Sequence, residues 1–420
     1  MTSLLLYLGV AVAIFVGFNI GGSNTGVAFG PAVGSGTVSK LGAGVLMSFF
    51  FLLGGWTLGR RVVDTLGKDL VSGDPFTMRV AVVVLLFIGL ALFAGNVLGV
   101  PASTSMTAVG AIVGLGLAIG QLKTNAVLEI VGWWLVAPIV GFWVSAMVGR
   151  YWYDDLDDYI DIDQSEGPLV TLDRSGGLPE PELGPGTTRR EFGGTLLVVG
   201  IGCYMAFSAG TSNVANAVAP LVGNGAITMT QGVLLAAGAT AIGALTIARR
   251  TLDTVGNDLT DLPLVAAVVV AVVSSSIVTV LSALSIPASF VVIATMSVVG
   301  LGWGRATVAD PVPDAPEVPG ASVGVPGESA SMPGESAGLP GEGATLPGGK
   351  AGPTRETTDE DRETGDADLD PDAGAAADGD PSAAELYQPA TTARVVLLQN
   401  LVPGIATVVA YVVFRYVPIL

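Results

Sequence analysis

Neutral polar residues that can bind ions interrupt otherwise apolar parts of the chain. Ser23 and Asn24 lie in "GGSNTGVAFGPAVGSG", and Ser212 and Asn213 lie in "GTSNVANAVAPLVGNG". Their hydroxyl and amide groups can donate hydrogen bonds to an anion, while their oxygen atoms can coordinate a small cation. Asparagine cannot take up a proton near neutral pH. These residues therefore predict ion binding without acid–base chemistry.

The two stretches are copies of one another. At a constant offset of 189 residues, Ser23 aligns with Ser212 and Asn24 with Asn213. Two further pairs of segments match at nearly this spacing: 57–70 with 246–259, and 100–117 with 286–303. Chance similarity between apolar helices would match Leu, Val and Ala, whereas these segments share paired arginines, an aspartate and prolines. The chain therefore contains an internal duplication.

The composition is that of a protein embedded in a membrane. Half of the 420 residues are hydrophobic, 13% are charged, and the mean hydropathy is +0.66. A soluble domain with a polar surface could not easily sustain these values. The opening "MTSLLLYLGVAVAIFVGF" has no basic region before its apolar run, so we expect a retained membrane segment and not a cleaved signal.

Ten apolar segments follow one another, five in each copy: 3–18, 41–59, 77–99, 105–121 and 126–149, then 193–208, 228–248, 263–284, 286–303 and 393–418. This pattern predicts an all-α polytopic membrane protein with about 10–12 transmembrane segments. An odd number of crossings per copy would make the second copy enter the membrane upside down. We therefore expect two inverted repeats around a common centre.

The expected organisation has five parts: 1–150, a first transmembrane repeat; 151–192, an acidic connecting loop; 193–305, a second transmembrane repeat; 306–392, a disordered acidic Pro/Gly-rich linker; and 393–420, the final helix of the second repeat. The net charge of −18 is concentrated in two places, because 151–190 and 306–392 hold 28 of the 36 acidic residues. Acid-rich, lysine-poor loops are typical of a high-salt cytoplasm and suggest a halophilic archaeon, although ordinary disorder also explains them.

The glycine-rich stretches predict interrupted helices. An unpaired backbone polar group in hydrocarbon costs several kcal/mol, so such a stretch is tolerable only where protein or a watery cavity surrounds it. Since 3–18 is short for a crossing, we expect 19–36 to complete it as a broken or re-entrant helix. A new helix N-terminus would attract an anion, and freed carbonyl groups would attract a cation. Two such breaks would face one central site.

Several motifs together resemble the inorganic phosphate transporter family (PiT type), whose duplicated signature is G-x-N-D-x-x-N-x-x-G-x-x-V-G-S/T. "GTSNVANAVAPLVGNG" is similar to the second copy, and "FGPAVGSG" to the end of the first. "PASTSMTAVGAIVG" resembles the Pro-x-Ser-Thr-Thr-His element, and "EIVGWWLVAPIVGF" the helix that follows it. The resemblance covers the chain except 306–392. It implies a secondary transporter in the cell membrane that moves inorganic phosphate by alternating access, with the substrate at the midplane.

The departures from this pattern bear on the coupling ion. Where the family has Asn-Asp, this chain has Ser23-Asn24 and Ser212-Asn213, so both signature carboxylates are missing. The later asparagine is kept as Asn216 only in the second copy. The resemblance implies that the family's aspartates help to bind the coupling cation, a role that cannot be carried over unchanged. We expect Na+ symport, with Asn24 and Asn213 as Na+ ligands; proton coupling is the alternative.

The substrate stays open between two oxyanions. Phosphate is favoured by the resemblance, and sulfate is the alternative because related sulfate carriers also lack the acidic pair and because sulfate has no proton to donate to a carboxylate. The candidate contact residues are Ser23, Asn24, Ser212, Asn213, Asn216, Ser103, Thr104 and Ser105. The last three follow a second expected helix break, at Pro101. Close packing of helices through small hydroxyl residues is the simpler explanation of that group.

Other classes of function have little support in the sequence. It holds no nucleotide-binding loop, no metal-ligand cluster and no nucleophile with a base, so we expect neither an enzyme nor an ATP-driven pump, no cofactor beyond Na+ or H+, and no nucleic acid partner. A passive anion channel is the alternative class. Membrane lipid is the expected surrounding, and a homodimer is one open assembly state. Arg60, Arg61 and Asp64, repeated at 249, 250 and 253, are interpreted as membrane-boundary anchors in preference to a gate or an anion funnel.

Overall fold

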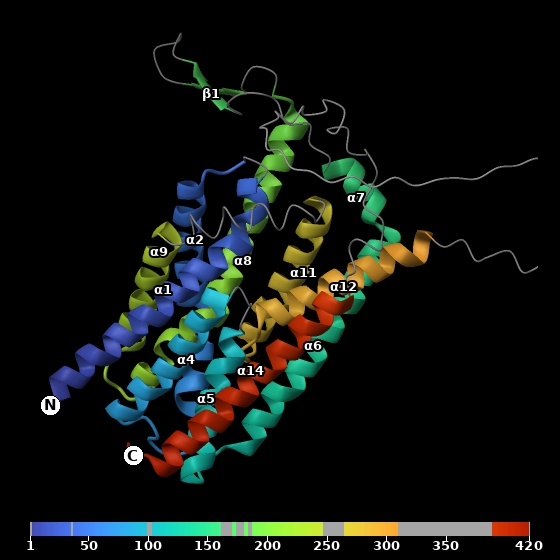
Figure 1. The fold of residues 1–420 in the computed structure, drawn as a ribbon. Coiled ribbons are helices and arrows are strands. Elements are labelled where there is room, and N and C mark those ends of the chain that lie inside the picture. Colours follow the sequence, from blue (N-terminus) through green and yellow to red (C-terminus); the bar gives the residue numbers. More distant parts are fainter. Residues whose placement is uncertain are drawn as a thin grey trace, which may run out of the picture. The chain divides into compact units, whose positions relative to one another are not determined.

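The computed structural model describes residues 2–34, 37–98, 103–160, 170–173, 180–183, 187–246, 264–309 and 389–419. One compact unit comprises residues 1–310 and 381–420. The predicted linker at 306–392 lies largely outside the described residues, because α12 continues to Ala309 and α14 begins at Pro389. The described part of the chain is almost wholly helical, with one short hairpin, β1 (Val170–Asp173) paired with β2 (Glu180–Leu183), in the segment that joins the two repeats (Figure 1).

The helices follow the two predicted sets. The first set contains α1 (Thr2–Gly34), α2 (Lys40–Gly54), the π-helical turn η1 (Gly55–Gly59), α3 (Arg60–Asp64), the π-helical turn η2 (Thr65–Asp69), α4 (Met78–Leu98), α5 (Thr104–Ile119), α6 (Thr124–Tyr151) and the short α7 (Tyr153–Ile160). The second contains α8 (Arg189–Gly223), α9 (Met229–Thr246), α11 (Leu264–Ala283), α12 (Phe290–Ala309) and α14 (Pro389–Tyr416).

Ten helical segments of the described chain are apolar enough to lie in a membrane. Eight are long enough to cross it, and α5 and Pro403–Tyr416 of α14 are shorter. Large apolar side chains such as Leu135, Ile139 and Trp143 of α6 are exposed on the outside of the helix assembly. In water such a surface would be unfavourable, whereas against lipid it is not. The prediction of an all-α polytopic membrane protein is thus confirmed.

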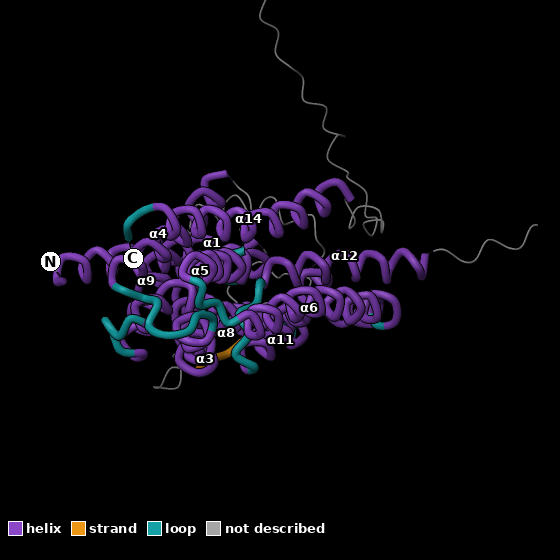
Figure 2. Tube along the Cα trace, turned by 90° about the horizontal axis from the view of Figure 1, so that it is seen from below, coloured by secondary structure: helices purple, strands orange, loops and turns teal. Residues whose placement is uncertain are grey.

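The main contacts between two helices each have a matching contact between their counterparts in the other set. α1 packs on α9 while α8 packs on α2, and α1 packs on α4 while α8 packs on α11. In the same way α6 packs on α12 and α14 on α5; α6 and α12 run side by side in both views (Figures 1 and 2). A two-fold relation between the repeats would produce this pattern. It would convert the contact between any two helices into a contact between their two counterparts, as α1–α9 is matched by α8–α2.

Glycines at matching positions allow these helices to touch through their backbones. A Cβ atom on Gly21 of α1 would collide with the Thr240 carbonyl of α9, and one on Gly210 of α8 would collide with the Phe51 carbonyl of α2. Gly21 and Gly210 are separated by the repeat offset of 189, and so are Phe51 and Thr240. Without a hydrophobic force between helices in lipid, such close approach is a main source of association. The signature glycines therefore form the helix crossings.

The break predicted in 19–36 is wrong: α1 runs without interruption from Thr2 to Gly34, and α8 from Arg189 to Gly223. The polar side chains bond back to their own helix. Asn19 Nδ2 donates to Phe15 O at 2.8 Å, Ser23 Oγ to Asn19 O at 3.1 Å, and Thr25 Oγ1 to Gly21 O at 2.7 Å. A 33-residue helix is roughly 50 Å long at 1.5 Å per residue, so it needs no re-entrant completion.

The chain reverses direction in two helical hairpins, α4–α5 and α11–α12. The start of α4 and the end of α5 meet at the same edge, where Ser72 N donates to Gln121 O at 2.8 Å and Lys123 N to Leu70 O at 2.9 Å. In the other hairpin, Val265 near the start of α11 shares a packed cluster with Leu301 near the end of α12. Because a hairpin adds either no crossing or two, an odd number of crossings per repeat stays the expectation.

Candidate functional site

A polar cavity lies where the N-terminal ends of α5 and α12 meet the C-terminal halves of α1 and α8. Its volume is about 70 Å³. One water needs roughly 10–15 Å³ of such space, so several waters or a small oxyanion fit. The residues that line the cavity are Ser23, Asn24, Val27, Leu92, Ser103, Thr104, Ser105, Asn213, Ala288, Ser289, Phe290 and Val291. Among these described residues none carries a charge.

The structure brings six of the eight predicted contact residues to the wall of this cavity: Ser23, Asn24, Asn213, Ser103, Thr104 and Ser105. They come from three elements separated by up to about half the chain, α1, α8 and the N-terminus of α5. The other two, Ser212 and Asn216, are fully buried directly behind the wall. Pro101, the expected second break, lies outside the described residues.

Asn216 organises the polar wall. Its Nδ2 donates to Asn213 Oδ1 and to Ser105 Oγ, both at 3.2 Å, and so joins α8 to α5. Asn213 Nδ2 in turn donates to Ser212 Oγ at 3.1 Å and to Ala209 O at 3.0 Å. The Asn216 Oδ1 atom is buried and has no hydrogen-bond partner among the described residues, so an acceptor is left for a cation or a water.

Asn24 offers the opposite chemistry. Its Nδ2 atom is buried without a hydrogen-bond partner in the described part of the chain, although the residue lines the cavity. A buried donor left unpaired costs about 1–3 kcal/mol, a cost that an acceptor in the cavity would remove. An anion oxygen or a water meets this requirement. The Na+ contact predicted for the Asn24 oxygen stays a prediction.

Two helix N-termini converge on the same cavity. Ser103 caps α5 by accepting a hydrogen bond from Met106 N at 3.3 Å, and Ser289 stands at the equivalent place before α12, accepting from Val292 N at 3.4 Å. The main-chain amides at a helix N-terminus carry partial positive charge and bind anions. Two helix N-termini at a cavity with no charged lining residue in the described structure would favour a small oxyanion.

The wall is polar on one side and apolar on the other. Positions 104 and 105 of the first hairpin are Thr and Ser, whereas the aligned positions of the second are Phe290 and Val291. Similarly, Val27 of α1 aligns with Asn216 of α8. The duplication thus gives two junctions between a long helix and a hairpin. The junction of α8 with α5 is polar, and the junction of α1 with α12 is apolar.

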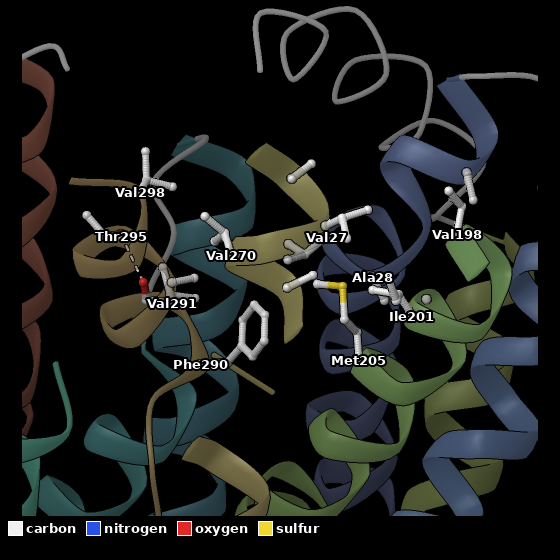
Figure 3. Close-up of a pocket in the computed structure, with 16 residues that line it drawn as sticks. Val27, Ala28, Val198, Ile201, Met205, Val270, Phe290, Val291, Thr295 and Val298 are labelled. Carbon is white, nitrogen blue, oxygen red and sulfur yellow. Dashed lines mark hydrogen bonds between the residues drawn. The ribbon is translucent and has the colours of Figure 1, made fainter. Parts of the chain in front are cut away.

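A second, larger cavity of about 240 Å³ adjoins the polar one on its apolar side. Val27, Phe290 and Val291 line both cavities. Figure 3 shows Phe290 of α12 and Met205 of α8 on opposite walls, with Val298 and Val198 farther along. Apart from Thr295, its lining side chains are apolar or glycine. This apolar cavity adjoins the polar cavity and is lined by α1, α8, α11 and α12.

Ser289 is the cavity residue that the sequence-based selection omitted. The residues after it are apolar, yet its own hydroxyl caps α12 at the cavity. The signal was present, because Ser289 aligns with Ser103 in the second copy of the Pro-Ala-Ser element. Leu92 and Phe290 line the cavity too, and nothing in an apolar run distinguishes them in advance.

Comparison with known proteins gives consistent matches. A family model described as "Phosphate transporter family" matches residues 20–155 and 182–325. The sulfate permease CysP of Bacillus subtilis is 29% identical over 297 residues, which are 70% of this chain and 77% of that protein. A sodium-dependent phosphate transporter of Toxoplasma gondii is 31% identical over 130 residues, 29% of this chain and 15% of that protein. A solved structure, "The sodium-dependent phosphate transporter", has the same fold with a TM-score of 0.58 at 18% identity, covering 73% of this chain and 91% of its own.

Proposed function

Since the chain belongs to the phosphate transporter family, we propose that it is a secondary transporter that carries a tetrahedral inorganic oxyanion across the cell membrane by alternating access. The family and the fold are those of transporters, so the prediction of a multi-pass membrane transporter rather than an enzyme is confirmed. The observation that supports an oxyanion is the convergence of two helix N-termini and the unpaired Asn24 donor on one uncharged cavity.

Phosphate and sulfate are both candidates, and the cavity favours sulfate. Phosphate has the support of the family as a whole and was the first expectation from the sequence. Sulfate cannot donate a hydrogen bond, so it loses nothing where both signature carboxylates are replaced by neutral groups. The relative matched along most of this chain is also a sulfate permease. These two observations lead us to place sulfate ahead of phosphate.

We propose Na+ as the coupling ion. Among the described residues, no titratable side chain lines the polar cavity, so proton uptake has no carrier there. The unpaired Asn216 Oδ1 atom and the oxygen of Asn213 are neutral acceptors of the kind that Na+ binds. The relative from Toxoplasma gondii is named as sodium-dependent, which supports the same choice.

Uptake into proteoliposomes tests the proposal. Purified protein is reconstituted, labelled sulfate and phosphate are offered separately, and inward Na+ or proton gradients are imposed one at a time, with protein-free vesicles as the control. We expect saturable sulfate uptake that requires the Na+ gradient and exceeds phosphate uptake. Preference for phosphate would overturn the substrate choice, and uptake driven by protons alone would overturn the coupling. Uptake that neither saturates nor follows a gradient would indicate a channel.

A further inference from the structure

The turn between α11 and α12 exposes main-chain carbonyl groups that neither helix uses. Three side chains from distant parts of the chain donate to them: Arg61 Nη1 to Ala283 O at 2.6 Å, Thr65 Oγ1 to Ser285 O at 2.8 Å, and Trp134 Nε1 to Pro287 O at 2.8 Å. An unsatisfied carbonyl at membrane depth would be costly. These bonds therefore fix the path of the turn that leads to Ser289 and the cavity.

The backbone of this turn is held in an uncommon conformation. Ile286 N donates to Leu281 O at 2.8 Å and Ser285 N to Ser282 O at 3.0 Å, the pattern in which a helix usually ends on glycine. Here the residue is Ser285, with φ of +67°. A non-glycine residue in this region persists when its surroundings hold it there. The Thr65 hydroxyl is bonded to the carbonyl of Ser285 itself.

Arg61 and Thr65 belong to a segment that also contacts the other wall of the site. Arg61 lies in α3, between the π-helical turns η1 and η2, and Thr65 is the first residue of η2. Such turns are rare and are frequent at functional sites. Within this segment, Gly55 lies against the Val214 side chain and Gly59 against the Gly210 carbonyl. The segment thus joins α8, next to Asn213, to the turn before α12.

We propose that Arg61 and Thr65 are positioning residues of the transport site, which hold the α11–α12 turn so that Ser289 and the N-terminus of α12 face the anion. The inference rests on the proposed function. It gives Arg61 a role other than membrane-boundary anchoring, since its guanidinium is bonded to Ala283 O. The sequence repeats both residues, as Arg250 and Thr254, at the offset of 189; these copies lie outside the described residues.

The chain offers a matched control for each residue. Arg60, the neighbour of Arg61, stacks on the Trp56 ring at 4.1 Å and donates from Nη2 to Thr230 Oγ1 of α9 at 3.5 Å. Thr57 donates its hydroxyl only to its own helix, to Leu53 O at 2.8 Å and Gly54 O at 3.2 Å. The variants Arg60→Gln and Thr57→Val therefore remove the same chemical groups without touching the turn.

Transport kinetics are the first test. Wild-type uptake of sulfate and phosphate is measured first, and the anion with the greater uptake is used for all variants. Loss of one hydrogen bond to the turn, about 1 kcal/mol, predicts a KM for that anion about fivefold higher in Thr65→Val and Arg61→Gln, with Vmax within about twofold. Thr65→Ser should restore the wild-type KM, and the two controls should stay within about twofold of it. A lower Vmax with an unchanged KM would overturn the inference.

Hydrogen exchange tests the same inference without any transport. We expect the amides of 284–292 to exchange at least about fivefold faster in Thr65→Val than in the wild type or Thr57→Val, in protein without substrate. Unchanged exchange would show that Thr65 does not hold the turn and would overturn the inference, even if neither anion were transported. If the wild type transports neither anion but exchange rises as expected, the proposed function fails and the positioning of the turn stands.

Discussion

Asn24 lines the polar cavity, and its buried amide donor has no protein partner among the described residues. If the anion is that partner, replacing Asn24 by Ala removes a hydrogen bond to a charged group, worth about 1.5–3 kcal/mol. We expect the KM for the transported anion to rise about tenfold or more. Asn19→Ala is the control, because Asn19 is a buried asparagine on the same helix whose amide bonds Phe15 O outside the cavity. An equal rise in both variants would contradict the role of Asn24.

The same position tests why the signature carboxylates are absent. Asn24→Asp would place a negative charge in a cavity that has no charged lining residue in the described structure. Two unit charges 4 Å apart repel by about 4 kcal/mol at an effective dielectric constant of 20. Phosphate can offset part of this repulsion by donating a hydrogen bond to the carboxylate, whereas sulfate cannot. We expect the ratio of phosphate to sulfate uptake to rise at least about tenfold in competition assays with both labelled anions. A ratio that stays constant would argue against a contact between the anion and residue 24.

At the scale of the helices, glycines allow close packing. A Cβ atom on Gly243 of α9 would collide with the Phe18 carbonyl of α1, whereas one on Gly238 of the same helix would meet nothing within 4 Å. We expect Gly243→Ala to lower the unfolding temperature in detergent, because overpacking typically costs about 1–3 kcal/mol. Gly238→Ala should leave it unchanged or raise it, since alanine favours helix by up to about 1 kcal/mol. Equal behaviour of the two variants would contradict the close crossing of α1 and α9.

The misplaced helix break shows what the sequence could not reveal. Asn19, Ser23 and Thr25 are residues typical of an interruption, but each donates to a carbonyl of the preceding turn and leaves α1 intact. Composition alone cannot distinguish a polar side chain that ends a helix from one that bonds back to it. The end of α11 before Ser289 was easier to anticipate, because Pro287 lacks a main-chain donor whatever the tertiary context.

The offset of 189 predicted which residues are equivalent, but it could not predict which copies face one another. Asn24 and Asn213 were selected from the duplication, and Ser103 from the expected break at Pro101; all three line one cavity. The hydrogen bond from Asn216 to Ser105 joins the second repeat to the first. Neither this bond nor the apolar pair at the aligned positions, Val27 and Val291, was predicted. Such contacts depend on how two separately duplicated units interlock, which only the tertiary structure contains.

At the scale of the whole molecule, the two junctions of the duplicated site differ in state as well as in chemistry. On one side, Asn216 and Ser105 are hydrogen-bonded and buried. At the aligned positions on the other side, Val27 and Val291 stand between the polar cavity and the larger apolar cavity. If transport proceeds by alternating access, the side that is packed here must open while the apolar cavity closes.

Cysteine labelling can follow this exchange, because Cys203 is the only native cysteine and Cys203→Ser removes it. Val298 lines the apolar cavity, and its aligned residue in the first repeat, Ile112, is 1% exposed. We expect a membrane-impermeant thiol reagent to label Val298→Cys in vesicles and to leave Ile112→Cys largely unmodified. The double variant Val27→Asn with Val291→Ser would build on the apolar side the counterpart of the Asn216–Ser105 hydrogen bond. One added hydrogen bond, about 1 kcal/mol, should shift the equilibrium between the two forms about fivefold. Labelling at position 298 should therefore slow and labelling at position 112 should accelerate, with the ratio of the two rates changing about fivefold.

The single variants complete this test as a double-mutant cycle. Val27→Asn alone, or Val291→Ser alone, introduces a polar group without its designed partner, so each should change the labelling rates less than the pair does. A coupling between the two substitutions that favours closure would mean that the pair stabilises the closed form of the apolar side directly. If the double variant only added the effects of its parts, or if labelling at 298 and 112 changed in the same direction, the two cavities would not be the alternating sides of one transport site.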